Sequence, residues 1–503
     1  MRNQKGITLV ALIITIIVLL VLAIVSINLV INGGIIGKAE SGTDSYLEAE
    51  IKEKVNLAYQ EWKMDKESGG SLDLKEVVEN ELNKSYGEES VDVSKAGKGV
   101  QVKVTKSGKE YEYTLIPDGT TVNGQLAYLD IADGNIDLYE NGYKQYTGSL
   151  QGLNKNGATE CNGKYIITGT TTENVVRVCD VGTYDITIKD LNINIKGKTP
   201  IICNARSIAN GHVVNITIEG DNYLTTTNGP AISFDIAYNT EESITDRSTI
   251  VFKGDGSLTA ELIGNNLGAV IGGSYGGGGG NNNCNANLIV NSGTYNLGLS
   301  YNGASLGSGL RGSGFFITIN GGKIYANGGA YGGAIGGRDG DGCITINGGY
   351  IETTGNSVIG YRWRNVEING GTIYTGRTSC KAGGNIKFTG GNILLKGKNP
   401  NIATYEEGTS NLIAYTPKNG TNNLYETQIK LQGVEKDKQI TKLTTSDNIN
   451  YGIKDMYTLE EGMLYLYLPL GTRTINVEVD GNKYSGTVET KETAEVVTLN
   501  MVN

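Results

Sequence analysis

A hexapeptide repeats through the middle of this 503-residue chain and restricts the folds that the chain can adopt. Its copies are LIVNSG at 288–293, ITINGG at 317–322 and 344–349, VEINGG at 366–371 and IKFTGG at 386–391. A second motif, a short apolar stretch that ends in glycine, lies at 269–272, 304–307, 334–336 and 357–360. Consecutive copies are roughly twenty to thirty residues apart, which is the period of a solenoid whose coils stack on one another.

Alternation within each copy predicts a strand that buries one face, because successive side chains point to opposite sides. Stacked coils would align three apolar rows, namely Val290, Ile319, Ile346, Ile368 and Phe388, then Leu288, Ile317, Ile344, Val366 and Ile386, then Ile324, Ile351, Ile373 and Ile393. One corner would collect Asn291, Asn320, Asn347 and Asn369. Asparagine tolerates left-handed backbone angles, and stacked amides can hydrogen-bond along the axis. The pattern predicts a right-handed parallel β-helix over residues 126–405.

The segments that flank the array have different periodicities. Residues 45–66 place apolar side chains three and four apart, which predicts an amphipathic helix, and residues 72–82 predict a shorter one. Alternation over 99–105 and 110–116 predicts an antiparallel hairpin, so 33–125 is interpreted as helix followed by a small sheet. Alternating strands over 406–503 predict an antiparallel β-sandwich that covers the open edge of the last coil. The predicted fold class is therefore mainly β.

An uncharged apolar run at residues 7–32 is long enough to cross the hydrocarbon core of a membrane once. Arg2 and Lys5 precede it, which predicts a cytoplasmic amino end and an extracellular bulk by the positive-inside rule. A cleaved secretory signal is the alternative, but its apolar region spans only about 7–15 residues and ends at an A-x-A-like site. The sequence predicts a single-pass protein of the cell membrane.

The residues that begin this run, KGITLVAL at 5–12, resemble the class III leader of type IV prepilins. The resemblance implies a leader at 1–6, removed by a prepilin peptidase between Gly6 and Ile7, with methylation of the new N-terminus. It also implies a transmembrane, pilin-like N-terminal helix, a pilin-like headpiece over 33–125 and other pilin subunits as partners. Ala11 occupies the fifth mature position, where the family usually carries Glu. A plain, uncleaved membrane anchor is the alternative.

The glycine-rich array is similar to repeat segments of clostridial-type surface proteins that are often labelled carbohydrate-binding. This resemblance covers about 126–400 and implies a surface glycan as partner. Rings on a solenoid face can lie flat against sugar rings, so the candidate glycan-binding residues are Tyr325, Tyr361, Trp363 and Tyr374. Exposed tyrosines that merely form part of a β-surface are the alternative interpretation.

Charge and carboxylate distribution argue against other function classes. The net charge is −10 and no basic patch stands out, so we expect no nucleic-acid partner. Carboxylates are missing from 262–338 and 368–405, although polysaccharide-cleaving sites need them in clusters. Asp339 and Asp341 resemble a calcium-binding turn, but the motif occurs once, so the sequence predicts no metal site. We therefore expect no enzyme and no cofactor.

Together these features predict a membrane-anchored, extracellular, pilin-like surface protein that acts in adhesion or glycan binding through a β-helix. Two alternatives stay open. One is a degenerate polysaccharide-active β-helix enzyme, and the other is a structural spacer or minor pilus subunit.

Overall fold

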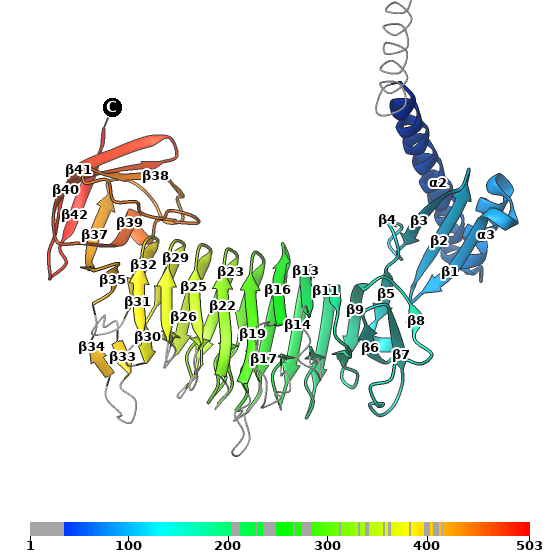
Figure 1. Cartoon of the computed structure of the whole chain (residues 1–503), viewed down its shortest axis with the longest axis horizontal. Coiled ribbons are helices and arrows are strands. Elements are labelled where there is room, and N and C mark those ends of the chain that lie inside the picture. The colour runs from blue at the N-terminus through cyan, green and yellow to red at the C-terminus, as the bar shows by residue number, and fades with distance from the viewer. Residues whose placement is uncertain are drawn as a thin grey trace, which may run out of the picture. The chain divides into compact units, whose positions relative to one another are not determined.

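The computed structural model describes residues 35–203, 212–227, 229–234, 248–264, 267–273, 283–310, 313–329, 332–337, 342–355, 358–360, 364–381, 384–396, 403–405, 412–414 and 416–502. The chain is mainly β and divides into two compact units, Met1–Gln125 and Leu126–Asn503 (Figure 1). The predicted leader and the predicted membrane span lie outside the described residues. Within those residues, no helix is both long and apolar enough for a membrane crossing.

The first unit combines two helices with one antiparallel sheet. Its elements are α2 (Ile35–Glu67), α3 (Leu74–Tyr86), the 3-10 turn η1 (Glu88–Ser90), and strands β1 (Val91–Ala96), β2 (Gly99–Lys106), β3 (Lys109–Leu115) and β4 (Thr121–Asn123). The strands pair in chain order. Ile51 and Val55 of α2 pack with Val78 of α3 in a core that the sheet completes. Asp73 caps α3 by accepting the Lys75 N–H at 3.0 Å, which satisfies one of the unpaired donors of the first turn.

Parallel strands of the second unit form three rows, and each repeat adds one strand to each row (Figure 1). Row 1 contains β5 (Ala127–Asp130), β9 (Lys164–Thr171), β11 (Thr183–Ile195), β13 (Val213–Glu219), β16 (Ser248–Gly254), β19 (Asn283–Val290), β22 (Ser313–Ile319), β25 (Cys343–Ile346), β28 (Asn365–Ile368) and β31 (Asn385–Phe388). Row 2 contains the end of β11, then β14 (Asp221–Thr226), β17 (Ser257–Leu262), β20 (Thr294–Leu297), β23 (Lys323–Gly328), β26 (Tyr350–Gly355), β29 (Thr372–Thr375) and β32 (Asn392–Leu395). Row 3 contains β6 (Asn135–Tyr139), β10 (Val176–Val178), β12 (Ile201–Ile202), β15 (Ile232–Ser233), β18 (Ile271–Gly272), β21 (Leu306–Gly307), β24 (Ile335–Gly336), β27 (Val358–Gly360), β30 (Arg377–Lys381) and β33 (Ala403–Tyr405).

Shorter elements complete the two ends of these rows. They are η2 (Ile131–Asp133), β7 (Gly142–Tyr146), β8 (Thr159–Glu160), β34 (Leu412–Ala414), β35 (Lys418–Asn419) and β36 (Asn422–Asn423). Strand β7 pairs antiparallel with β6, and β34 pairs antiparallel with β33. Both outermost strands of row 3 therefore have a partner, which limits the exposed backbone there.

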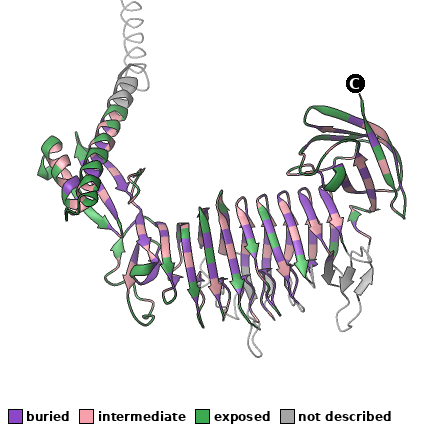
Figure 2. Cartoon of the chain, turned by 180° about the vertical axis from the view of Figure 1, so that it is seen from behind, coloured by how far each residue is buried: buried purple, intermediate pink, exposed green. Residues whose placement is uncertain are grey.

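The strand registers align the three predicted sets of apolar side chains from one repeat to the next. Ile317 lies opposite Leu288 and Ile344, and Ile319 lies opposite Val290 and Ile346. These side chains are buried in one continuous core, whereas the residues between them are only partly buried (Figure 2). Burying the aliphatic side chains contributes about 1.5–3 kcal/mol each, so the repeated pattern itself supplies the main stabilisation.

The asparagine corner forms a ladder of side-chain hydrogen bonds. The Asn320 amide donates to Asn291 at 2.9 Å, Asn347 donates to Asn320 at 2.9 Å, and Asn369 donates to Asn347 at 3.0 Å. The ladder confirms the predicted stacking of these amides at one corner.

Replacing Asn347 with alanine should lower the free energy of unfolding by about 1–3 kcal/mol, because two hydrogen bonds of the ladder are lost: Asn320 Oδ1 loses its donor and Asn369 Nδ2 loses its acceptor. Asn296→Ala is the matched control, since that exposed amide makes only a 3.4 Å contact with Thr259. Urea unfolding of the full chain measures both variants. Equal losses in the two variants would contradict a stabilising ladder.

In several strands of row 3, the apolar residue is followed by a glycine, and these glycines lie next to one another in successive repeats. Gly272, Gly307, Gly336 and Gly360 all have positive φ, between 106° and 138°. A Cβ built on Gly307 would lie 2.0 Å from the Gly336 carbonyl oxygen, and one on Gly272 would lie 1.8 Å from that of Gly307. At these positions, neighbouring coils lie too close together for any residue with a side chain larger than that of glycine.

The sole histidine is buried on the first coils. His212 Nδ1 lies 3.1 Å from the Gly182 carbonyl oxygen, and the ring meets the edge of Tyr184. Burial lowers the pKa of His212 below 6.5. As pH falls through about 6.5, the unfolded chain takes up a proton that the folded chain refuses, so stability decreases toward acid.

We expect His212→Gln to flatten this decrease. The measurement is urea unfolding at several pH values between about 7 and 5.5, above the range in which most carboxylates titrate. If wild type and variant kept the same slope, His212 would not be the group responsible.

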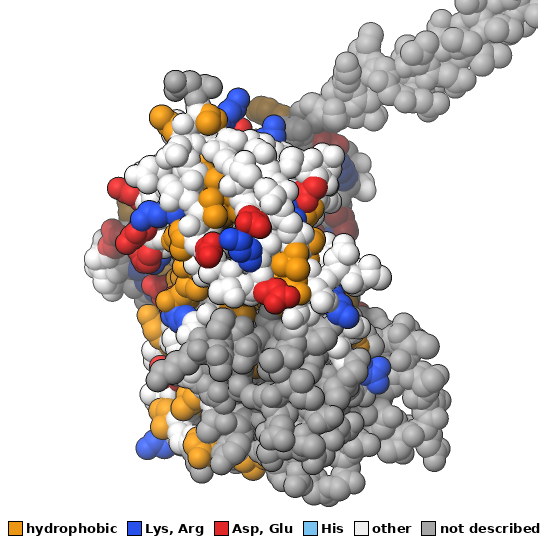
Figure 3. Space-filling view, turned by 90° about the vertical axis from the view of Figure 1, so that its left-hand side faces the viewer, with side chains coloured by type: hydrophobic (Ala, Val, Ile, Leu, Met, Phe, Trp, Pro, Cys, Tyr) orange, Lys and Arg blue, Asp and Glu red, His pale blue; other side chains and the backbone are white. Residues whose placement is uncertain are grey.

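The C-terminal module is a six-stranded sheet around a separate apolar core. Its strands are β37 (Tyr425–Leu431), β38 (Ile440–Thr445), β39 (Met463–Leu468), β40 (Gly471–Val479), β41 (Asn482–Thr490) and β42 (Val496–Val502), with the 3-10 turn η3 (Glu460–Gly462) before β39. Strands β37 and β42 pair in parallel, which differs from the predicted antiparallel module. The β41–β42 hairpin fixes the direction of β42, which inserts beside β37. Figure 3 shows this end of the molecule, where charges of both signs surround exposed apolar side chains.

One segment of this module, residues 449–459, runs along the asparagine corner and is called the strap below. Gly452 exchanges backbone hydrogen bonds with Thr389 and Gly391, and the Lys454 carbonyl oxygen accepts from the Gly371 N–H at 2.7 Å. Asp455 accepts from the Gly349 N–H at 2.9 Å. The strap therefore contacts successive coils along the stack.

Candidate functional site

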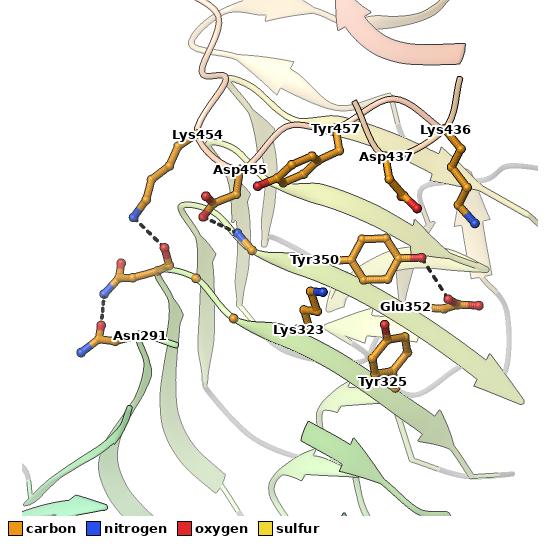
Figure 4. Close-up of a pocket in the computed structure, with 14 residues that line it drawn as sticks. Asn291, Lys323, Tyr325, Tyr350, Glu352, Lys436, Asp437, Lys454, Asp455 and Tyr457 are labelled. Atoms are coloured by element: carbon orange, nitrogen blue, oxygen red, sulfur yellow. Dashed lines mark hydrogen bonds between the residues drawn. The ribbon is translucent and has the colours of Figure 1, made fainter. Parts of the chain in front are cut away.

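A cavity of about 720 Å³ lies between the outward face of row 2 and the C-terminal module (Figure 4). Strands β23 and β26 supply Lys323, Tyr325, Tyr350 and Glu352 from one side. The strap and the segment before β38 supply the other side, namely Lys436, Asp437, Lys454, Asp455 and Tyr457. Period-two alternation explains the first group, because residues two apart on a strand share a face. The volume lies within the range of about 300–1,000 Å³ that is typical of ligand pockets.

Three tyrosines give the cavity its aromatic surface. The Tyr325 and Tyr350 ring centroids are 5.8 Å apart with the planes inclined at 49°. Tyr457 comes from the strap, on the opposite side of the cavity (Figure 4). Tyr325 is 37% exposed, so a ligand in the cavity can reach its ring.

Hydrogen bonds hold the polar groups of the cavity in place. The Tyr350 hydroxyl donates to Glu352 Oε2 at 3.0 Å, and Glu352 Oε1 lies 3.9 Å from Lys396 Nζ. Burial, reinforced by the Glu352 carboxylate, raises the pKa of Tyr350, so its hydroxyl stays protonated. Lys454 Nζ donates to the Asn320 carbonyl oxygen at 2.6 Å. These bonds fix the orientation of groups that a ligand would meet.

A second cavity of about 310 Å³ adjoins the first along the same face. The two cavities share Tyr325 and Glu352, and together they are called the groove below. The second cavity adds four uncharged polar side chains, namely Thr259, Asn296, Asn327 and Thr354. The groove therefore follows the stacking direction over several coils.

Of the two predicted glycan-binding residues that the structure describes, Tyr325 lines the groove and Tyr374 does not. Tyr325 and Tyr374 occupy one outward row, with Glu352 between them in register. Lys396 Nζ lies 3.1 Å from the Tyr374 ring centroid and covers that ring, so Tyr374 does not line the groove. Other predicted sites lie outside the described residues, namely Gly6, Ile7, Asp339, Asp341, Tyr361 and Trp363.

Sequence reasoning missed Tyr350, Asp437 and Tyr457. Tyr350 could have been found, because it lies two residues before Glu352 and therefore on the same outward face. No periodicity connects Asp437 or Tyr457 to the repeats, since both belong to the C-terminal module. Their place in the groove follows from tertiary contacts alone.

Four free thiols occur among the described side chains, and three of them are buried while Cys343 is half-buried. In the same described parts of the chain, no three His, Cys, Asp or Glu side chains gather in a way that could hold a metal ion. Cys161, Cys179 and Cys203 are buried free thiols. Burial raises the pKa of Cys179 and of Cys203 to about 12, which keeps both thiols protonated and unreactive.

Comparison of the chain with protein-family models, curated proteins and solved structures gave no match.

Proposed function

We propose that residues 126–405 form a right-handed parallel β-helix and that residues 406–503 form a β-sandwich on its last coils. The support is the order in which the chain visits the three rows, together with parallel pairing between equivalent strands of successive repeats. A single solenoid accounts for both features, because each coil adds one strand to each face.

We further propose that the protein is an extracellular, membrane-anchored, pilin-like surface protein that binds glycans without chemically altering them. The groove carries the glycan part of this proposal, because it combines accessible tyrosine rings with oriented hydroxyl, amide and carboxylate groups. The apolar run at 7–32 and the prepilin-like leader carry the part on location.

A degenerate polysaccharide-cleaving enzyme is the second candidate, because Glu352, Asp437 and Asp455 all line the larger cavity. Glycoside hydrolysis requires one carboxyl group to give up a proton while another remains ionised. Asp455 is tied to the Gly349 N–H, and Glu352 accepts the Tyr350 hydroxyl and lies near Lys396. These contacts suit carboxylates that hold a ligand better than a carboxyl group that donates its proton.

Glycan retention tests the proposal. The full chain would be purified in a polyoxyethylene detergent, because detergents with sugar headgroups would compete, and applied to immobilised neutral and acidic oligosaccharides. We expect retention of at least one glycan without release of shorter products. A chain retained by none of them would refute the glycan role, and product release would favour the enzyme.

The location is tested separately by sequencing the N-terminus of material from the host cell. Ile7 at the N-terminus of sheared surface material is the expected result. An intact Met1 in the membrane fraction would leave an uncleaved anchor and contradict the pilin-like origin.

A further inference from the structure

We infer that the groove binds an uncharged, hydroxyl-rich oligosaccharide and that the C-terminal module forms half of this site. The inference rests on the proposed glycan binding and specifies its ligand class and its location. Its starting point is that five residues of this module line the larger cavity opposite β23 and β26, namely Lys436, Asp437, Lys454, Asp455 and Tyr457 (Figure 4). The module therefore does more than cover the last coils.

The balance of charge in the groove disfavours a strongly charged ligand. Three lysines and four carboxylates line the two cavities, namely Lys323, Lys436 and Lys454 with Glu261, Glu352, Asp437 and Asp455. Lys436 lies 2.9 Å from Glu460 of η3, and Lys454 is bonded to the Asn320 carbonyl oxygen. An acidic chain would thus meet no excess of free cations, and like charges facing each other are costly.

The polar groups of the groove instead match hydroxyl groups. Carboxylate oxygens of Glu352 and Asp437 accept hydrogen bonds, whereas the amides of Asn296 and Asn327 both donate and accept. Hydroxyls carry one donor and two acceptor sites, so a sugar can use both kinds of group. The second cavity offers mostly uncharged partners of this kind, which extends the match along the groove.

The tyrosines supply the apolar contact that such a ligand needs. The ring planes of Tyr325 and Tyr350 are inclined at 49° to each other, and Tyr457 faces these two rings from the strap. The C–H faces of sugar rings are apolar, and tyrosine provides a rigid apolar surface with a polar tip. Tyr325 borders both cavities, so a chain of sugar rings that occupies both must pass it.

Tyrosine variants test the site. The full chain in polyoxyethylene detergent would be titrated calorimetrically with neutral tetrasaccharides of N-acetylglucosamine, β-1,4-glucose and mannose, and with tetragalacturonate. We expect a neutral tetrasaccharide to bind. Tyr325→Ala and Tyr457→Ala should each weaken its affinity at least about tenfold, since aromatic side chains that become buried by a partner dominate many binding sites. Binding should change little between low and moderate salt, because charge screening affects ionic contacts most.

Tyr223→Ala is the matched control. Tyr223 lies in the same outward row as Tyr325, is 48% exposed, and lines neither cavity. Thermal unfolding checks that each variant is folded, and Tyr457→Leu, which removes the ring but keeps an apolar side chain, replaces Tyr457→Ala if the latter is not.

Each outcome separates the inference from the proposal on which it rests. Binding that is unaffected by Tyr325→Ala would overturn the groove as the site while glycan binding stands. Binding of tetragalacturonate alone would overturn the ligand class. Loss in Tyr325→Ala but not in the folded Tyr457 variant would remove the C-terminal module from the site. Retention of no glycan at all would overturn both proposals.

Discussion

Gly307→Ala is expected to destabilise the Leu126–Asn503 unit by more than about 4 kcal/mol, a loss that only severe packing defects cause. The new Cβ would lie 2.0 Å from the Gly336 carbonyl oxygen, and Gly307 has a φ of +135° that L-residues rarely adopt. Neither problem can be relieved by turning a side chain, because the obstacle is the backbone of the next coil. The neighbouring glycines Gly272 and Gly336 hold that coil spacing on both sides.

Gly197→Ala separates backbone strain from the clash. Gly197 also has positive φ, at +73°, but nothing lies within 4 Å of a Cβ built on it. We expect this control to lose about 1 kcal/mol, the usual order for a strained turn position. Urea unfolding followed by far-UV circular dichroism gives both values. Similar losses in the two variants would show that the coils can move apart.

Arg177→Met is expected to cost about 3–5 kcal/mol, because it leaves a buried carboxylate without its cation. Asp137 and Arg177 are register partners on β6 and β10, and their two side-chain contacts measure 2.7 and 2.6 Å. The side chains are only 1% and 11% exposed. Tyr146 also donates to Asp137 at 3.1 Å, but one hydroxyl cannot replace the guanidinium charge.

The double variant Asp137→Leu with Arg177→Met completes the experiment. Replacing both charges with apolar groups is often neutral or stabilising, so most of the loss should be recovered. The same urea unfolding measures the single and double variants, and Asp137→Leu alone closes the cycle. A double variant as unstable as Arg177→Met would mean that the pair itself, rather than the unpaired charge, determines stability.

The repeats made much of the second unit predictable. Alternation and the recurring Asn-Gly pair specify which side chains share a face, so Ile317, Ile344 and Asn347 could be placed relative to one another without coordinates. The first unit was predictable for a similar reason, since helical spacing marked α2. Strand β1 was not predicted, because Val91–Ala96 has a weak apolar pattern. Only two of its apolar side chains are buried, and Val91 is half-buried.

The groove could be predicted only on the side that belongs to the repeats. Tyr325 was identified from its outward position, but its partner Tyr457 is held in place by the strap, whose Asp455 meets a residue 106 positions earlier in the chain. Contacts at such separation leave no periodic trace in the sequence. Tyr374 was also placed on the outward face from the sequence, but the sequence did not indicate that Lys396 covers its ring.

The strap has a consequence for how the coils find their correct partners. Residues 317–322 and 344–349 are the same hexapeptide, so a stack displaced by one repeat would place identical side chains in nearly identical surroundings. The coils alone therefore discriminate weakly against mispairing. The strap adds contacts to several copies, because Lys454 reaches Asn320, Asp455 reaches Gly349, and Gly452 reaches Gly391. The strap comes from outside the repeats and contacts several of them at once, so a coil could leave the stack only by breaking its contacts with the strap as well as those with its neighbours.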